Sequence, residues 1–206
     1  MKTGKTVLLY GASGHAKVIA DCLKSRDDNV LAIFDDNPDI KELGGIDVIG
    51  AYNSSFHSEL TLIISIGANR IRKIIAEKVA HGFHTSAHAS AIVSPSAVIG
   101  LGSVLMHGAI VQADAAVGKH NIINTGASVD HDCVLEDFVH ISPHATLCGN
   151  FSVGEGTQIG AGATVIQGIK IGKWCMIGAG AVIMEDVPDY SVVVGVPGKV
   201  IKTTGY

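Results

Sequence analysis

One histidine of the chain has the neighbours that acid–base chemistry requires. Among ten histidines, only His131 is flanked on both sides by carboxylates, Asp130 and Asp132. Imidazole has an unperturbed pKa of about 6.5, and a carboxylate bonded to one ring nitrogen fixes the tautomer and raises the basicity of the other. His131 is therefore a candidate general base. The same pattern also occurs in ordinary solvated histidines, which is the alternative interpretation.

A segment near the N-terminus could bind phosphate. The sequence GASGH at residues 11–15 follows an apolar run and precedes a helical pattern. Where a loop enters a helix, backbone N–H groups and the helix dipole favour a phosphate group. The segment lacks the complete GxGxxG pattern, which argues against NAD and favours a nucleotide linked to a sugar. A strand-to-helix turn without a ligand is the alternative.

These residues require a small α/β domain to position them. Apolar runs at residues 7–10, 30–34 and 60–66 alternate with helical periodicity at residues 17–23 and 71–79, as in a parallel sheet. Asn69 is placed to cap the second helix. The carboxyl ends of such strands form the ligand site, and residues 11–15, Asp35, Asp36 and Gly67 all fall there.

From residue 93 onward, an aliphatic residue occupies every sixth position. The positions are Val93, Ile99, Leu105, Val111, Val117, Ile123, Val129, Leu135, Ile141, Leu147, Val153, Ile159, Val165, Ile171, Ile177 and Ile183. The residue four positions later is often small, as at Ala97, Ser103 and Ala109. This period predicts a triangular β-helix with three hexapeptides per coil. A sandwich of short strands is the alternative, but such strands seldom keep one period without a slip.

The composition argues against several classes of partner. The 206 residues carry a formal net charge of −4 and no run of Lys or Arg, unlike proteins that bind nucleic acids or anionic membranes. No stretch approaches the roughly 18 apolar residues of a membrane span, and the N-terminal apolar run is too short for a signal peptide. The four cysteines are scattered, which is typical of reduced thiols. We therefore expect a cytoplasmic protein that binds small molecules.

Taken together, the motifs resemble those of one family of hexapeptide-repeat acyltransferases. The resemblance covers nearly the whole chain and rests on YGASGH at residues 10–15, DD at 35–36, IGAN at 66–69, NT at 124–125, DHD at 130–132, VHIS at 139–142, CGN at 148–150 and VGVPGK at 194–199. The family joins a nucleotide-sugar-binding domain to hexapeptide repeats. It includes UDP-4-amino-sugar and GDP-perosamine N-acetyltransferases and sialic acid O-acetyltransferases.

This resemblance implies a fold and an activity. The fold is a Rossmann-like α/β domain at residues 1–85 followed by a left-handed parallel β-helix at residues 86–206. The activity is acetyl transfer from acetyl-CoA to the amino group of a UDP-4-amino-4,6-dideoxy sugar in bacterial glycan biosynthesis. A homotrimer with active sites between neighbouring chains is implied as well, without a metal.

The resemblance also implies a role for individual residues. His131 is the general base and Asp132 orients it, with Asp130 as the fallback. Acetyl-CoA is contacted by His140, Gly149, Ala161 and Ala179, and the backbone N–H of Gly149 stabilises the developing oxyanion. The nucleotide sugar is contacted by Ser13, Gly14, His15, Asp35, Asp36, Gly67, Asn124 and Thr125.

Other functions remain open at this point. O-acetylation of a sugar hydroxyl would use the same base and co-substrate. A γ-type carbonic anhydrase, with zinc held by three histidines, would use the same β-helix. A nucleotide-sugar sensor would bind without turnover. Within an acyl transfer, Cys133 or Cys148 could form an acyl-cysteine, but direct attack needs no protein nucleophile. These motifs do not specify which nucleotide base the sugar carries or which sugar carbon is acetylated.

Overall fold

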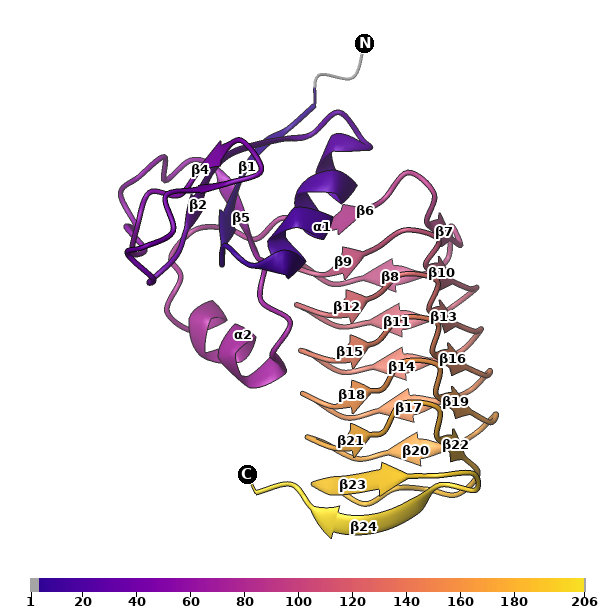
Figure 1. Cartoon of the computed structure of the whole chain (residues 1–206). Coiled ribbons are helices and arrows are strands. Elements are labelled where there is room, and N and C mark those ends of the chain that lie inside the picture. Colours follow the sequence, from indigo (N-terminus) through magenta and orange to yellow (C-terminus); the bar gives the residue numbers. More distant parts are fainter. Residues whose placement is uncertain (1–3, 206) are drawn as a thin grey trace.

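The computed structural model describes residues 4–205, in which an N-terminal α/β unit packs against the side of a triangular prism (Figure 1). The outermost residues of the two expected domains, 1–3 and 206, lie outside the described residues. None of the helices between residues 4 and 205 is long and apolar enough to cross a lipid bilayer.

The N-terminal unit is built on a three-stranded parallel sheet of order β2-β1-β5. Its elements are β1 (Thr6–Tyr10), α1 (Gly14–Lys24), β2 (Asn29–Phe34), β3 (Glu42–Leu43), β4 (Ile46–Asp47), β5 (Thr61–Ile64) and α2 (Asn69–Ala76). The central strand β1 is apolar because both of its faces are covered. Leu9 packs with α1 and the prism, whereas Leu8 packs with residues of β2, β5 and α2.

Short parallel strands form the three faces of the prism. The first face contains β6 (Ser86–Ala87), β9 (Val104–Leu105), β12 (Ile122–Ile123), β15 (His140–Ile141), β18 (Gln158–Ile159), β21 (Met176–Ile177), β23 (Ser191–Val194) and β24 (Lys199–Thr203). The second contains β7 (Ile92–Val93), β10 (Ile110–Val111), β13 (Ser128–Val129), β16 (Thr146–Leu147), β19 (Thr164–Val165) and β22 (Val182–Ile183). The third contains β8 (Val98–Ile99), β11 (Ala116–Val117), β14 (Val134–Leu135), β17 (Ser152–Val153) and β20 (Lys170–Ile171).

Pairing between coils follows the predicted eighteen-residue register. Ile110 of β10 pairs with Ile92 one coil before and Ser128 one coil after. The chain visits the faces in the order first, second, third, and we name the edges between them the 1–2, 2–3 and 3–1 edges. The last coil is shorter, since Met176 pairs with Val192, and the antiparallel pair β23–β24 closes this end of the prism.

The edges are made by one repeated turn. Every sixth residue from Gly102 to Gly180 has a positive φ. Glycine suits this conformation, and Asp and Asn tolerate it better than most residues. Asp132, with a φ of 58°, is one of these residues, so the turn itself explains an aspartate at this site.

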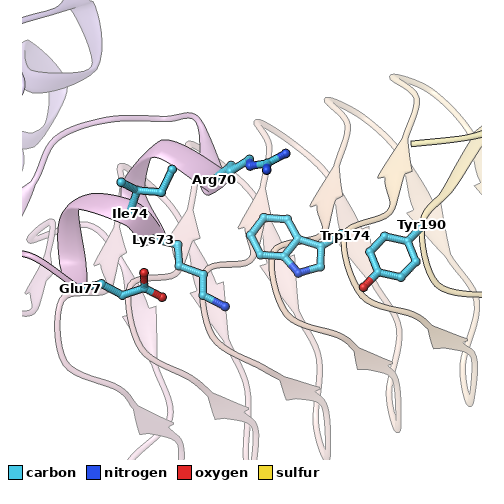
Figure 2. A pocket seen from close by; sticks show the side chains of 6 residues that line it. All are labelled: Arg70, Lys73, Ile74, Glu77, Trp174 and Tyr190. Carbon is cyan, nitrogen blue, oxygen red and sulfur yellow. The ribbon is translucent and has the colours of Figure 1, made fainter. Parts of the chain in front are cut away.

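Aromatic residues occupy the same turn position on the 3–1 edge. The rings of His120 and Phe138 stack with 5.0 Å between centroids, and Trp174 follows two coils further along. Helix α2 lies beside this edge, where Lys73 pairs with Glu155 and lies over the Trp174 ring (Figure 2). The aromatic turns thus face the N-terminal unit.

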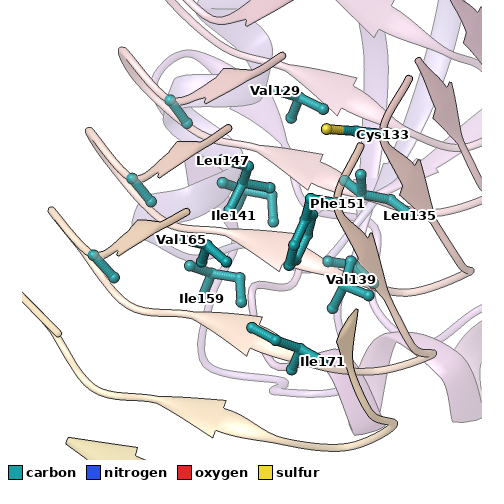
Figure 3. Close-up of a cluster of buried hydrophobic side chains, with 14 of the residues drawn as sticks. Val129, Cys133, Leu135, Val139, Ile141, Leu147, Phe151, Ile159, Val165 and Ile171 are labelled. Atoms are coloured by element: carbon teal, nitrogen blue, oxygen red, sulfur yellow. The ribbon is translucent and has the colours of Figure 1, made fainter. Parts of the chain in front are cut away.

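From Leu105 onward, the predicted aliphatic column forms the core of the prism, whereas Val93 at its start is 37% exposed. Ile141, Ile159 and Val165 point inward with no measurable exposure, and Figure 3 shows them stacked between coils. The residue four positions after each aliphatic one was expected to be small in many repeats. In one repeat, this position is occupied by the buried Phe151. The expected fold class is confirmed: an α/β unit followed by a parallel β-helix of hexapeptide repeats.

One expectation about the α/β unit is wrong. Asn69 does not cap α2, whose N-cap residue is Ala68. Instead, the buried Asn69 amide Nδ2 donates to the carbonyl oxygen of Gly156 at 2.9 Å, on the 3–1 edge. The Asn69 side chain, which could have capped an isolated helix, thus bonds to the prism instead.

Candidate active site

The loop after β1 has a fixed conformation. Gly11 has a φ of 111°, and a Cβ there would lie 2.5 Å from Ile66 Cγ1, so no other residue fits without displacing its neighbour. The Ser65 hydroxyl fixes the loop by donating to the carbonyl oxygens of Tyr10 and Gly11. Ser13 and Gly14 are exposed at the start of α1, and a Cβ on Gly14 would meet no atom within 4 Å.

The two predicted aspartates, Asp35 and Asp36, have different hydrogen-bond partners. Asp35 Oδ2 accepts the Ala12 N–H at 2.6 Å, so this carboxylate shapes the loop. Asp36 accepts the Tyr10 hydroxyl at 3.1 Å and borders a cavity of about 380 Å³. Burial, and then the bond to Asp36, raises the pKa of Tyr10 to about 12, so the phenol stays protonated.

This cavity has the shape and lining of a base-binding site. It is lined by Tyr10, Asp36, Ala51, Tyr52, Ile71, Ile74, Ile75, Lys78 and Val79. The Tyr10 and Tyr52 rings stack at 5.9 Å, and the apolar face of α2 forms another wall. An acidic acceptor beside flat apolar walls suits a nucleoside, whose base has both ring faces and polar edges.

A second group of predicted residues meets where α1 reaches the first face. The His15 and His140 rings lie 6.3 Å apart, and Asn124 Nδ2 lies 3.0 Å from His140 Nε2. The Thr125 N–H donates to Asn124 Oδ1 at 2.8 Å, and the backbone of Gly67 lies against His140. We call His15, Gly67, Asn124, Thr125 and His140 the buried group.

Both imidazoles of the buried group are held neutral. Burial, with a smaller contribution from the charge of Arg72, lowers the pKa of His15 to about 4 and of His140 to about 3. His15 Nε2 is buried without a hydrogen-bond partner among the described residues. Since buried polar atoms are normally bonded, this nitrogen indicates a place for a ligand or a water molecule.

The predicted base stands on the 2–3 edge, in the open. His131 Nδ1 lies 2.8 Å from Asp132 Oδ2, and both side chains are 60% exposed. Asp130 instead accepts the His131 backbone N–H at 2.8 Å. The bond to Asp132, and then the charge of Asp130, raises the pKa of His131, and Nε2 is free to accept a proton.

Gly149 makes room for this ring one coil further on. A Cβ on Gly149 would lie 2.6 Å from His131 Cε1 and 2.7 Å from Nε2. Real Cβ atoms do not come this close, so any larger residue would displace the imidazole. We call His131, Asp132 and Gly149 the exposed group.

The structure does not bring the two groups together in one chain. The prism residues of the buried group lie on the first face and the 1–2 edge, and its other members, His15 and Gly67, come from the N-terminal unit. The exposed group lies on the 2–3 edge. Ala161 and Ala179 are exposed on the 1–2 edge, in the same column as Thr125. No hydrogen bond or ring contact between residues 4 and 205 links the groups. One chain therefore holds two separate groups of candidate residues, which we call the candidate half-sites.

The structure also bears on the thiol alternative. Cys133 follows Asp132 directly, but its side chain points into the core with no measurable exposure. Burial raises the pKa of its thiol, which disfavours the thiolate that nucleophilic chemistry needs. Cys133 is thus a residue of the core.

Two clusters, one around Arg72 and one of three potential metal ligands, could not be predicted from the sequence. Arg72 falls in an ordinary helical pattern, yet it is 1% exposed, next to the buried group. Asp21, His88 and His107 come from three separate segments, and their potential metal ligands lie within 4.8 Å of one another. Both clusters depend on the docking of the α/β unit onto the prism, which no local spacing encodes.

Comparisons with known proteins match both parts of the chain. Residues 6–79 match the PglD N-terminal domain, and residues 150–184 match the bacterial transferase hexapeptide family of six repeats. UDP-N-acetylbacillosamine N-acetyltransferase from Bacillus subtilis (strain 168) is 42% identical over 111 residues, 50% of this chain and 51% of that protein. The alignment thus spans about half the length of this curated relative.

Solved structures match nearly the whole chain. The acetyltransferase domain of PglB from Neisseria gonorrhoeae FA1090 is 39% identical, with a TM-score of 0.90 over 96% of this chain and 100% of that one. It has also been solved with acetyl coenzyme A. A mutant of perosamine N-acetyltransferase from Caulobacter crescentus, in complex with CoA and GDP-perosamine, is 37% identical, with a TM-score of 0.92 over 97% of both chains. The chain therefore belongs to the family of hexapeptide-repeat sugar N-acetyltransferases that carry a PglD N-terminal domain.

Proposed function

We propose that this protein transfers the acetyl group of acetyl-CoA to the amino group of a nucleotide-linked amino sugar, at a site shared by two copies of the chain. The observation that carries the proposal is the separation of the half-sites. A base on the 2–3 edge can reach a sugar held on the 1–2 edge if a second copy supplies one of them. Three such contacts close a ring around a threefold axis, so we propose a homotrimer.

The nucleotide sugar is assigned to the N-terminal unit, which we delimit at residues 1–85. The diphosphate lies at Ser13 and Gly14, where α1 begins, and the base lies in the cavity beside Asp36. The sugar then points toward His15, Asn124 and Thr125, whereas His140 beside them contacts the acetyl-CoA. The relatives support this assignment, since one of them was solved with GDP-perosamine. We propose a UDP-4-amino-4,6-dideoxy sugar of bacterial glycan biosynthesis, because the Bacillus relative is named for bacillosamine.

Acetyl-CoA is assigned to the groove between two copies, in the part of the chain at residues 86–206. Its pantetheine arm lies along Ala161 and Ala179, whose small side chains leave the 1–2 edge open. Its thioester carbonyl oxygen accepts the backbone N–H of Gly149. This donor stabilises the negative charge that develops when the carbonyl carbon becomes tetrahedral.

The reaction then follows from the exposed group. The sugar nitrogen attacks the thioester carbon, and His131 Nε2 takes the proton that the nitrogen releases. Asp132 Oδ2 accepts the hydrogen bond of the Nδ1–H group throughout and stabilises the imidazolium. The tetrahedral intermediate collapses, the C–S bond breaks, and CoA leaves as a thiol with the proton from His131. The unpaired cysteines and the use of acetyl-CoA support a cytoplasmic location.

The shared site can be tested by mixing two inactive variants. His131→Ala lacks the general base, and His140→Ala lacks one imidazole of the buried group. In an assay of CoA thiol release from acetyl-CoA with a UDP- or GDP-amino sugar, each variant alone should be almost inactive. Refolded together, they should regain about a quarter of the wild-type rate, because about a quarter of the contacts then join two intact half-sites. If the mixture stays inactive while each variant forms trimers by light scattering, the shared site is wrong.

A further inference from the structure

Arg72 is the largest fully buried side chain among residues 4–205, with 1% of its surface exposed. It lies on α2, between the N-terminal unit and the 3–1 edge of the prism. A buried guanidinium is unusual because removing a charge from water is costly. Its position therefore requires a structural reason.

All five N–H groups of Arg72 are bonded, and every acceptor is neutral. Nε donates to the carbonyl oxygen of His120 at 2.8 Å, and Nη2 donates to that of Phe138 at 3.1 Å and to Asn69 Oδ1 at 2.8 Å. Nη1 donates to the carbonyl oxygens of Ile66 at 3.0 Å and Gly67 at 3.1 Å. The guanidinium thus ties the turn at residues 66–67 to two successive coils of the prism.

No carboxylate in the described part of the chain forms an ion pair with Arg72. The acids on the neighbouring elements have other partners: Glu155 pairs with Lys73, Asp137 accepts the Lys119 N–H, Asp36 accepts the Tyr10 hydroxyl and Asp35 accepts the Ala12 N–H. The titratable groups that its charge reaches are the imidazoles of His15, His120 and His140. The charge is therefore uncompensated.

The turn that Arg72 holds belongs to the buried group. Gly67 lies against His140, and a Cβ on Gly67 would meet no atom within 4 Å, so one side of the turn faces open space. A shift of this turn would move the wall of the sugar site. The guanidinium is thus placed to affect both the shape and the electric field of that site.

We propose that Arg72 is a positioning residue of the sugar site, which fixes the turn at residues 66–67 against the prism and gives the site a positive charge. This inference rests on the proposed function. A fixed positive charge disfavours protonation of any base bound near it. The amino group of the sugar is such a base, and only its neutral form has the lone pair that attacks a thioester. Arg72 therefore favours the nucleophilic form of the substrate.

The two roles can be separated with two variants. Arg72→Lys keeps the charge and loses the planar fork, so KM for the nucleotide sugar should rise about tenfold while the pH profile of kcat stays in place. Arg72→Met loses both. Its KM should rise similarly, and the acidic limb of kcat should move to higher pH by about one unit, because the bound ammonium loses its proton less readily.

Lys73→Met provides the matched control. Lys73 is the next residue on α2 and also links that helix to the prism, through its ion pair with Glu155. Its side chain points toward Trp174 on the 3–1 edge (Figure 2), and it is not a member of the buried group. This variant should keep the wild-type KM and pH profile. If the two Arg72 variants, folded and trimeric, behave like Lys73→Met, Arg72 only supports docking and the proposal is wrong.

An NMR titration gives a readout that does not need turnover. The imidazole pKa values of His15 and His140 should rise in Arg72→Met and stay unchanged in Arg72→Lys. Unchanged values in Arg72→Met would refute the electrostatic role. If the imidazole pKa values shift but the wild-type protein acetylates no nucleotide amino sugar, the proposed function fails and the electrostatic role of Arg72 stands.

Discussion

The two half-sites use the same residue type in opposite environments. His140 is enclosed between the α/β unit and the first face, and burial lowers its pKa to about 3. His131 stands on an exposed turn, where hydrogen bonding to Asp132 raises its pKa. Burial therefore keeps the His140 imidazole neutral, whereas the neighbouring carboxylates favour the protonated form of the His131 imidazole. The surroundings, more than the residue, determine which role each histidine takes.

In the proposed function, this contrast separates substrate binding, by the buried group, from proton transfer, by the exposed group. The buried group is rigid and preorganised by the contact between the two parts of the chain. The exposed group is simple, since it needs only a turn, an acid and a glycine to make room. They lie on different edges of the prism, and the proposed function joins them across two copies of the chain. The following predictions test this division, from the largest expected effect to the smallest.

The largest effect should come from removing the base. His131→Ala should lower kcat by about 10²–10⁴-fold, the range expected for loss of a positioned general base, and leave KM for the nucleotide sugar nearly unchanged. Steady-state kinetics of CoA release would measure both. His57→Ala is the matched control, because His57 also pairs with an acid, Glu59 at 3.0 Å, but lies outside both groups. A near wild-type kcat for His131→Ala would overturn its role.

The next effect should come from crowding the base without removing it. Gly149→Ala places a methyl group 2.6 Å from His131 Cε1, so the ring must move. We expect kcat to fall by up to about 10²-fold, since displacing a reacting group by about 1 Å has effects of this size. Gly82→Ala is the control, where the added methyl would make an ordinary contact at 3.6 Å with Thr61. Equal kcat values for the two variants would show that Gly149 leaves the ring free.

The smallest effect should come from Asp132→Asn, which keeps the shape and removes the charge. Since Asp132 raises the pKa of His131, its loss lowers that pKa, and the imidazole becomes neutral at lower pH. The pKa of the His131 imidazole, followed by NMR titration, should therefore fall, and the plateau of kcat should fall by roughly tenfold because the base is weaker and less well oriented. An imidazole pKa that rises, or does not change, would contradict this pairing.

The repeats were highly predictable from sequence, because each hexapeptide buries the same position. The period of Ile141, Ile159 and their neighbours reports a local rule that recurs in every coil. The pairing of His131 with Asp132 is equally local, since the two residues are adjacent. Family resemblance supplied the roles of Gly149 and His140, which spacing alone does not show.

Other features depend on docking, and the sequence could not reveal them. Asn69 looks like a helix cap until the prism offers a carbonyl oxygen, and Arg72 looks like a surface residue until α2 meets the 3–1 edge. Phe151 occupies a position expected to be small because the interior of the coil has room for it. In each case a surface far away in the sequence decides the role.

The repeated turn on the edges of the prism has a consequence for length changes in this chain. A deletion of six residues would rotate every later residue onto the next face and exchange the roles of the edges. A deletion of eighteen would keep all faces and lower the rest by one coil, about 4.8 Å. Within the regular coils after His131, insertions and deletions of whole coils therefore keep each later residue on its face, and they change its height along the prism in fixed steps.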